Sequence, residues 1–372
     1  MILTRPFRSI AAAASLMLVV VMAACTSPAG EIQEPTLPAE ADPTVYRTGF
    51  YLTVGELADD GKSRTTPVGD YNAGEGIENF IDLENGNFHV LLYTVSNTFL
   101  AEITELQITP VESYDSSKRY YINGATKANI SNGNFKVMVI ANWPQELPKQ
   151  PSMDNVFATR FDFNGTAPSK ENPIPLYGIT QVTLGELQPG VAYNLGNIHL
   201  IRAVAKIELI IDDNVSERLT PSKVQLTRYN KQGFCAPSVK SQSDYVQNNW
   251  GLDYLAKPYI PTPVEQGQQL DFTVVEEGKR YVLYVPEFAN SHLLAAENRS
   301  RICINFKESL LEDRFIDLID NSTSVPVIAD IKRNVWYRLR LINVNENVEP
   351  ICEVNVMPYK VIDLDPIFGI DK

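Results

Sequence analysis

Alternation of apolar and polar side chains with a two-residue period is the feature that most limits what this chain can fold into. Phe50, Leu52 and Val54 alternate with polar or small neighbours, as in a strand with one buried face. Similar strand patterns, some of them apolar on both faces, recur along the chain between turn residues. They occupy residues 88–95, 135–141, 198–209, 270–275, 280–285, 301–306, 336–344 and 352–357. Helical periodicity is weak and confined to short segments, so the sequence predicts an all-β protein.

Two antiparallel β-sandwiches in tandem are the predicted architecture. The chain has 372 residues, which is more than one sandwich of this kind usually contains. Residues 45–196 are assigned to an N-terminal domain and residues 197–372 to a C-terminal domain. Residues 25–44 are rich in Pro, Glu and Ala and are expected to form a flexible tether before them. Asn-Gly pairs predict hairpin turns at residues 85–86, 123–124 and 132–133.

The N-terminus has the layout of a bacterial lipoprotein signal. Arg5 and Arg8 precede an apolar stretch that is shorter than a membrane-spanning helix and ends in small residues before Cys25. The sequence therefore predicts a signal peptide over residues 1–24. It also predicts lipid on Cys25, which anchors the protein to a membrane outside the cytoplasm. The alternative is an ordinary secretory signal followed by an unmodified cysteine.

Charge and composition argue against several function classes. A formal net charge of -13 makes the chain a poor partner for nucleic acid or for an anionic lipid surface. His89, His199 and His292 have no Cys or His at metal-ligand spacing. The sequence contains no phosphate loop, nucleophile elbow or calcium loop, and its adjacent carboxylates lie at expected turns. We therefore expect no enzyme activity, no metal and no cofactor.

The remaining cysteines, the tryptophans and a basic cluster are interpreted as structural. Three cysteines follow Cys25 and form at most one disulfide, with burial as small apolar residues favoured: Cys235, Cys303 and Cys352. Four basic residues lie close in sequence: Lys332, Arg333, Arg338 and Arg340. The last two share a strand face, which is expected to be solvated. Packing in the core or at turns is favoured for the tryptophans over a sugar-stacking platform: Trp143, Trp250 and Trp336.

Several different short motifs follow one another in a characteristic order along nearly the whole chain after residue 45. They are Ser63-Arg64-Thr65 after the first strand, GEGIENFID at 74–82, VIANW at 139–143, IPLYG at 174–178, RAVAKI at 202–207, Arg333-Asn334 with Tyr337, and the closing residues 358–360 and 368–369. In this order and spacing they resemble the Bacteroidetes fimbrillins, the major and minor fimbrial subunits of type V pili. The resemblance implies two transthyretin-like β-sandwich domains in a subunit that polymerises by donor-strand exchange and contributes to adhesion.

The resemblance also implies a processing site. In that family the lipoprotein precursor reaches the outer membrane, where an arginine-specific protease cuts the loop after the first strand. Carried over to this chain, the cut falls between Arg64 and Thr65 and removes a strand at about 48–57. The polar stretch at 59–67 is expected to be exposed to proteases. The removed strand carries Phe50, Leu52 and Val54, so its loss opens an apolar groove.

The expected partner of that groove is an extended segment of another subunit. In this family the donor is usually C-terminal, which places it here within residues 358–372. Its apolar side chains do not alternate cleanly and are interrupted by Pro366: Val361, Ile362, Leu364, Ile367 and Phe368. The expected locations are the outer membrane for the lipid-anchored precursor and the surface fimbrium for the assembled subunit.

Other functions remain open at this point. A tip or anchor subunit of the same pilus need not polymerise, and an anchor keeps its first strand and its lipid. A monomeric surface lipoprotein that binds polysaccharide through Trp143 or Trp250 belongs to a different class. A glycosidase needs two carboxylates about 5–10 Å apart across a cleft, and the sequence indicates no such pair. The sequence does not identify a receptor.

Overall fold

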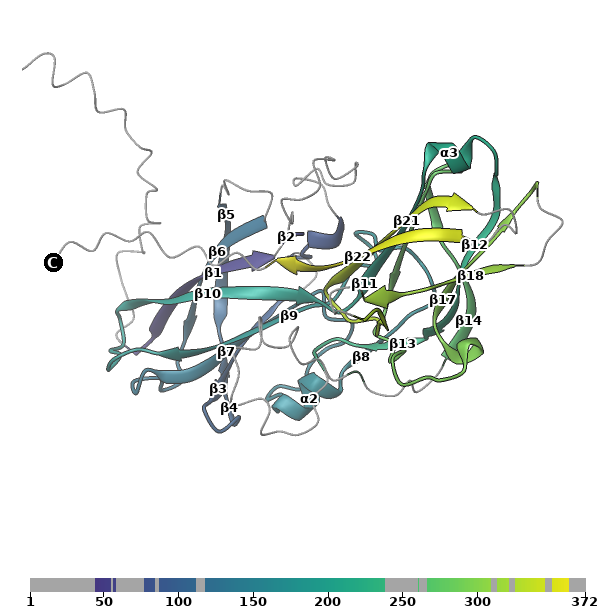
Figure 1. Cartoon of the computed structure of the whole chain (residues 1–372). Coiled ribbons are helices and arrows are strands. Elements are labelled where there is room, and N and C mark those ends of the chain that lie inside the picture. The colour runs from purple at the N-terminus through teal and green to yellow at the C-terminus, as the bar shows by residue number, and fades with distance from the viewer. Residues whose placement is uncertain are drawn as a thin grey trace, which may run out of the picture. The chain divides into compact units, whose positions relative to one another are not determined.

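The computed structural model describes most of the chain from residue 44 onward, and the described residues lie in one compact unit. The described residues are 44–54, 56–57, 77–83, 87–111, 118–237, 260, 266–308, 313–320, 325–344 and 350–360. They contain strands β1 to β22 and only short helices, which confirms the predicted all-β class (Figure 1).

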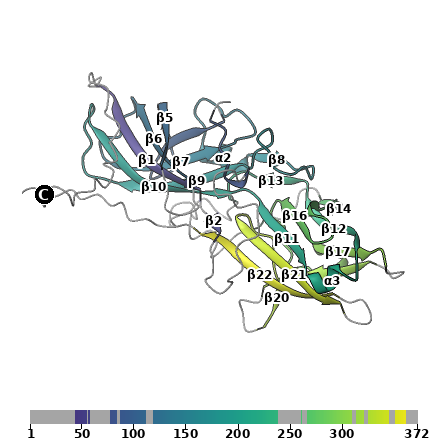
Figure 2. The ribbon, with the colours of Figure 1, turned by 90° about the horizontal axis from the view of Figure 1, so that it is seen from above.

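Eight strands form the first sheet, in the order β4-β3-β7-β9-β10-β1-β6-β5. Their bounds are β1 (Tyr46–Val54), β3 (His89–Thr94), β4 (Phe99–Glu102), β5 (Thr104–Val111), β6 (Lys118–Thr126), β7 (Asn134–Ala141), β9 (Leu176–Thr183) and β10 (Ala192–Arg202). This order places β1 in the interior of the sheet, between β10 and β6 (Figure 2). Side chains from both halves of the sheet, such as Val90, Val137, Ile122 and Ile198, enclose one apolar cluster.

Strand β7 is apolar on both faces because both of its faces are covered. Val137 and Val139 lie in the enclosed cluster, whereas Met138 and Ile140 lie in a second cluster. Helix α2 (Met153–Ala158) closes this second cluster with its apolar side chains. A capping box formed by Ser152 and Asn155 begins the helix. Helix α2 is not predictable from the sequence pattern, because six residues are too few to establish a helical period.

Two further sheets face each other across a third apolar cluster. The six-stranded sheet has the order β15-β16-β11-β21-β22-β2, and the four-stranded sheet has the order β14-β12-β17-β18. Their bounds are β2 (Glu56–Leu57), β11 (Ala205–Ile211), β12 (Pro221–Asn230), β14 (Gln266–Asp271), β15 (Thr273–Glu276), β16 (Arg280–Val285), β17 (Arg301–Phe306), β18 (Arg314–Asp317), β21 (Val335–Val344) and β22 (Pro350–Lys360). Ile207 and Leu209 of one sheet lie in this cluster with Leu226 and Ile304 of the other.

The remaining elements are short. They are the paired strands β8 (Arg160–Asp162) and β13 (Gln232–Phe234), the paired strands β19 (Ile319–Asp320) and β20 (Val327–Ile328), helix α3 (Asp213–Ser216), and the 3-10 helices Ile77–Asn79 and Ala296–Asn298. In the described part of the chain, no helix has the length and apolar character needed to cross a bilayer.

The sheets are mixed, whereas purely antiparallel sheets were predicted. β1 runs parallel to β10, and β11 runs parallel to β21. The two members of each pair are far apart in sequence, so the connection between them is long enough to permit parallel pairing.

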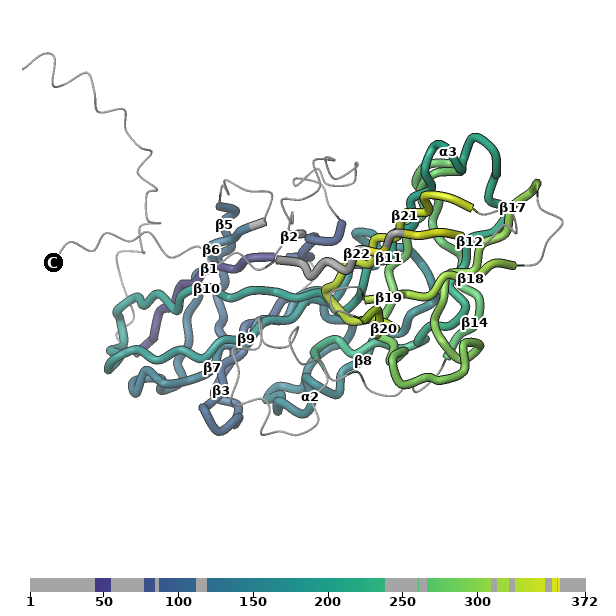
Figure 3. Tube along the Cα trace, in the orientation of Figure 1, coloured from purple at the N-terminus to yellow at the C-terminus, as the bar shows by residue number. Residues whose placement is uncertain are grey.

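The strand predicted at residues 198–209 is two strands in different sheets. β10 ends at Arg202 and β11 begins at Ala205, and the chain passes from one sheet to the next between them (Figure 3). The predicted domain boundary between residues 196 and 197 lies inside β10, whose residues 197–200 still pair with β1. The division into two domains stays a prediction.

One of the predicted Asn-Gly turns is wrong. Asn123 and Gly124 lie inside β6, where a Cβ on Gly124 would stand 2.3 Å from the side chain of Ile103. Glycine at position 124 therefore makes room for the Ile103 side chain and does not form a turn. The pair at 132–133 does form a turn, with Gly133 at φ +61°. The pair at 85–86 lies outside the described residues.

Candidate functional site

The strand whose removal the resemblance to the fimbrillins implies lies inside the first sheet, between β10 and β6. β1 pairs with β6 over all nine of its residues and with β10 on its other side. Phe50, Leu52 and Val54 are fully buried in the enclosed cluster. Both backbone edges and the apolar face of β1 are therefore engaged by the rest of the sheet.

Removing β1 would open a slot with defined walls. Leu52 lies opposite Ile198 on β10 and Tyr120 on β6, and Val54 lies opposite Leu200. Each lost side chain contributes about 1.5–3 kcal/mol of apolar burial. The slot would also leave hydrogen-bonding groups unpaired along both neighbouring strands, which is the kind of template that captures another strand.

The strand that follows β1 contacts a different sheet. In β2, Glu56 lies opposite Lys360 and Leu57 lies opposite Tyr359, at the end of β22. β22 is also the last described strand before the tail at 361–372. The described residues of 48–57 thus pair with strands of the first sheet and with the C-terminal strand.

A buried polar cluster joins three of the sequence motifs. Glu78 forms an ion pair with Lys206, whose Nζ lies 2.7 Å from the Glu78 Oε1, and both side chains are almost completely buried. Arg202 donates to the Glu78 carbonyl at 3.1 Å, to the side-chain oxygen of Asn334 at 2.9 Å, and to the side chain of Asn79. The motifs at 74–82, 202–207 and 333–334 therefore meet at one point of the fold.

The charges in this cluster keep Glu78 ionised. Burial alone would raise the pKa of Glu78, but the positive charges of Lys206 and Arg202 outweigh it and lower the pKa to about 2. Tyr284 also donates its hydroxyl hydrogen to this carboxylate. The Lys206 ammonium lies 4.9 Å from the centre of the Trp336 ring. Since every member has a partner, the cluster acts as a rigid polar joint.

Sequence reasoning missed this joint. Arg202, Lys206 and Glu208 alternate with apolar residues, which is typical of the solvated face of a strand, but all three are buried. Glu208 is paired with Arg280 at 2.6 Å and with Arg338 at 3.3 Å. One sequence signal could have indicated these buried charges: charged residues alternate with strictly apolar ones in a long strand that has no turn residues.

The basic cluster at 332–340 is also partly buried. The Arg333 side chain is fully buried, with a 2.7 Å ion pair to Glu287 and hydrogen bonds to the carbonyls of Phe234 and Cys235. Arg338 is only 17% exposed, so it does not lie on a solvated face. Arg340 is half exposed, as predicted.

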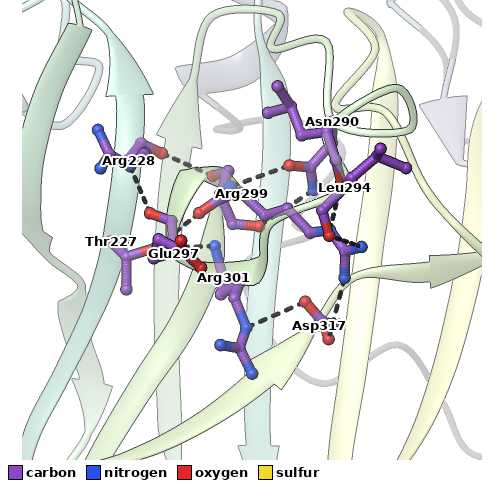
Figure 4. Close-up of polar contacts among 10 residues, drawn as sticks. Thr227, Arg228, Asn290, Leu294, Glu297, Arg299, Arg301 and Asp317 are labelled. Carbon is purple, nitrogen blue, oxygen red and sulfur yellow. Dashed lines mark hydrogen bonds and ion pairs between the residues drawn. The ribbon is translucent and has the colours of Figure 1, made fainter.

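A loop between β16 and β17 is braced by polar contacts (Figure 4). Arg299 donates to the carbonyls of Leu293 and Leu294 at 2.8 and 3.0 Å. The side chain of Asn290 bonds both the N–H and the carbonyl of Ser300. The loop thus presents Leu294, which is 93% exposed, on a fixed backbone.

Several predicted site residues fall outside the described residues. They are Cys25, Arg64, Thr65, Trp250, Val361, Ile362, Leu364, Ile367 and Phe368. Trp143 is described and is only 1% exposed, which confirms the favoured prediction of core packing and excludes a sugar-stacking role for its ring. Its ring packs in the cluster that α2 covers.

The three cysteines of the folded part are free. Cys235 and Cys303 are buried, and Cys352 is half-buried. Burial raises the pKa of the Cys303 thiol to about 11 and that of Cys352 to about 12, which makes both poor nucleophiles. Within the described ranges, His, Cys, Asp and Glu side chains form no group that could hold a metal ion.

Comparison with known proteins identifies the fold. No protein-family model matches the sequence, and no curated protein matches it significantly. Among solved structures, the C-terminally truncated tip fimbrial protein Mfa3 from Porphyromonas gingivalis matches with a TM-score of 0.53 and 15% identity, over 84% of this chain and 100% of that chain. A fimbrial assembly protein from Parabacteroides distasonis matches with a TM-score of 0.45 and 14% identity, over 85% and 100%. This chain therefore has the fold of the fimbrial protein Mfa3, as the resemblance to the fimbrillins predicted.

Proposed function

We propose that this chain is a structural, non-enzymatic subunit of a cell-surface fimbria of the type V kind. It is exported as a lipoprotein, carries lipid on Cys25 and reaches the outer membrane as a precursor. Two tandem sandwich domains, at about 45–196 and 197–372, form its folded part. The shared fold with a fimbrial protein supports this proposal, as does the order of the sequence motifs.

Polymerisation proceeds by exchange of the first strand. An arginine-specific protease cuts between Arg64 and Thr65, which releases β1 together with the lipid. The slot between β10 and β6 then takes an extended segment of another subunit, drawn from residues 358–372. The observation that carries this step is the interior position of β1 with Phe50 and Leu52 fully buried, because a slot with two open edges and an apolar floor favours strand capture.

A tip subunit is the second candidate. The Mfa3 structure, which matches with a TM-score of 0.53, is that of a tip fimbrial protein, and this supports the second candidate. N-terminal sequencing of the protein on the cell surface separates the remaining roles. A start at Thr65 indicates a processed stalk or tip subunit, whereas an acylated Cys25 indicates an anchor or an unprocessed precursor.

Replacing Arg64 by Ala tests the proposed function. Wild-type precursor treated with an arginine-specific protease is expected to form ladders that resist SDS, because each exchanged strand buries several large side chains. The R64A variant is expected to remain a lipidated monomer under the same conditions, as followed by gel electrophoresis and by mass spectrometry of the N-terminus.

Lys62→Ala is the matched control, because it removes a neighbouring charge without touching the cleavage bond. It is expected to behave as wild type. Cleaved wild-type protein that stays monomeric at high concentration, with its own tail present, would contradict the stalk role. Ladders from uncleaved R64A would contradict the requirement for processing.

A further inference from the structure

The outward face of β1 and its neighbours carries an ordered set of aromatic, amide and basic side chains. Residues on β1 alternate, so those next to Phe50, Leu52 and Val54 point away from the enclosed cluster. Register pairs extend this outward face across β5, β6, β1 and β10. Three rows of residues cross the four strands in the order β5, β6, β1 and β10. The first row is Val111, Arg119, Thr53 and His199. The second is Thr109, Tyr121, Tyr51 and Asn197, and the third is Gln107, Asn123, Gly49 and Asn194. We call these twelve positions, with Arg47 beyond the third row, the tyrosine–arginine face.

Two tyrosines form the centre of this face. The rings of Tyr51 and Tyr121 lie with their centres 5.0 Å apart. The Tyr121 hydroxyl lies directly over Gly49, where a Cβ would come within 2.3 Å of it. The lack of a side chain at Gly49 therefore allows the Tyr121 ring to pack against the backbone of β1. Both tyrosines are half-buried, so part of each ring is open to solvent.

Basic side chains stand at both ends of the tyrosine pair. The Arg119 guanidinium lies 4.3 Å from the centre of the Tyr51 ring. Arg47 lies opposite Ala125 and Ala192 in the register, and its Nε, like that of Arg119, is buried with no hydrogen-bond partner in the described part of the chain. Thr53, the register partner of Arg119, follows Arg47 by six residues, which is about 20 Å along a strand. In the described part of the chain, neither arginine has an ion pair with a carboxylate.

The charge of the face is opposite to that of the whole protein. None of the twelve positions holds Asp or Glu, although the chain has a net charge of -13. The arginine fork matches a carboxylate in geometry as well as in charge. Asn123 and Gln107 offer side-chain amides that both donate and accept hydrogen bonds, whereas the Asn197 amide is already bonded to Thr53 and His199. This combination suits a ligand with hydroxyl groups, ring faces and negative charges.

We propose that the tyrosine–arginine face binds a linear oligosaccharide of uronic acids. Sugar rings pack on Tyr51 and Tyr121, their hydroxyls bond the amides, and their carboxylates pair with Arg119 and Arg47 at the two ends. A polyuronide carries a carboxylate on every ring, so it supplies negative charge at both ends of the aromatic pair. β10, β1 and β6 each have strand partners on both edges, so the centre of the face offers an extended peptide no free backbone edge.

This site belongs to the chain that retains β1. Arg47, Gly49, Tyr51 and Thr53 all precede Arg64, so a cut there would remove these four positions from the face. The inference does not depend on the proposed function, because the uncleaved protein binds the ligand whether or not its cleaved form polymerises.

Titration of the uncleaved full chain with tetragalacturonic acid tests the proposal, with its fully methyl-esterified form as the neutral ligand of the same length. Calorimetry is expected to show binding of the acid at least tenfold tighter than of the ester, with an affinity that falls as salt is added. The variants R119Q and R47Q are each expected to weaken binding of the acid about tenfold, as loss of a charge-assisted hydrogen bond does.

Two further variants keep the result independent of folding. Thr109→Glu places a carboxylate next to Tyr121 at an exposed position and is expected to abolish binding, whereas Thr109→Gln is expected to retain it. Arg160→Gln is the matched control, because Arg160 also covers an aromatic ring, that of Phe234, away from the face. Equal affinity for acid and ester, no binding of the acid, or unchanged binding in T109E would overturn the proposal. Binding of an acidic peptide in place of the saccharide would also overturn it.

Discussion

Replacement of Glu78 by Gln is expected to lower the free energy of unfolding by about 3–5 kcal/mol. The substitution keeps the size of the side chain but leaves the charges of Lys206 and Arg202 buried without their counter-ion. Loss of one partner of a buried ion pair costs this much because the remaining charge has no solvent to stabilise it. Urea denaturation of the precursor at pH 7 gives the difference directly.

Glu102→Gln is the matched control for this prediction. Glu102 pairs with His89 at 2.7 Å, but its side chain is 41% exposed, so its loss is expected to cost less than about 1 kcal/mol. Equal effects of the two substitutions would show that burial does not set the strength of the Glu78 pair.

Glu78 also makes stability depend on pH in a defined window. Its pKa is about 2 in the folded protein and 4.5 when unperturbed, so the unfolded chain binds its proton more readily. The stabilisation is complete above pH 4.5 and is lost as the pH falls from there towards 2. Wild-type protein is therefore expected to lose more of its unfolding free energy than E78Q between pH 6 and pH 3. If wild type and E78Q differed in unfolding free energy by the same amount at pH 6 and at pH 3, the lowered pKa of Glu78 would be contradicted.

Replacement of Phe50 by Ala is expected to cost about 3–5 kcal/mol of unfolding free energy in the uncleaved protein. Phe50 is fully buried in the cluster enclosed by the first sheet, so truncation removes its contacts and leaves a cavity. The lost contacts are those that hold β1 between β10 and β6. Thermal and urea unfolding measure it, and hydrogen exchange of β1 amides is expected to accelerate.

Tyr51→Ala on the same strand is the control for Phe50→Ala. Tyr51 is also aromatic but lies on the outward face and is only half-buried, so its truncation is expected to cost less than half as much. If both variants lost the same stability, the enclosed cluster would not be what holds β1 in the sheet. If β1 is the removable strand, cleaved F50A is also expected to release it and assemble faster than cleaved wild-type protein.

Local patterns and long-range neighbours contributed differently to what could be predicted. The alternation of Phe50, Leu52 and Val54 established which face of β1 is buried, because side-chain direction in a strand repeats every two residues. The same rule failed for Arg202 and Lys206, whose strand face is covered by the 3-10 helix carrying Glu78. A residue 124 positions away in the chain leaves no trace in a local period.

The sequence by itself determined that this chain is built of strands, where many of them lie, and which side chains of the first strand face the interior. These properties follow from the alternation of neighbouring residues, which is local. Only the tertiary structure decided that β1 lies inside the sheet beside β10 and β6, that the buried ion pairs meet at one joint, and that Arg47, Tyr51, Arg119 and Tyr121 share one face. Those relations depend on which distant strands pair, and pairing is set by the packing of the whole core.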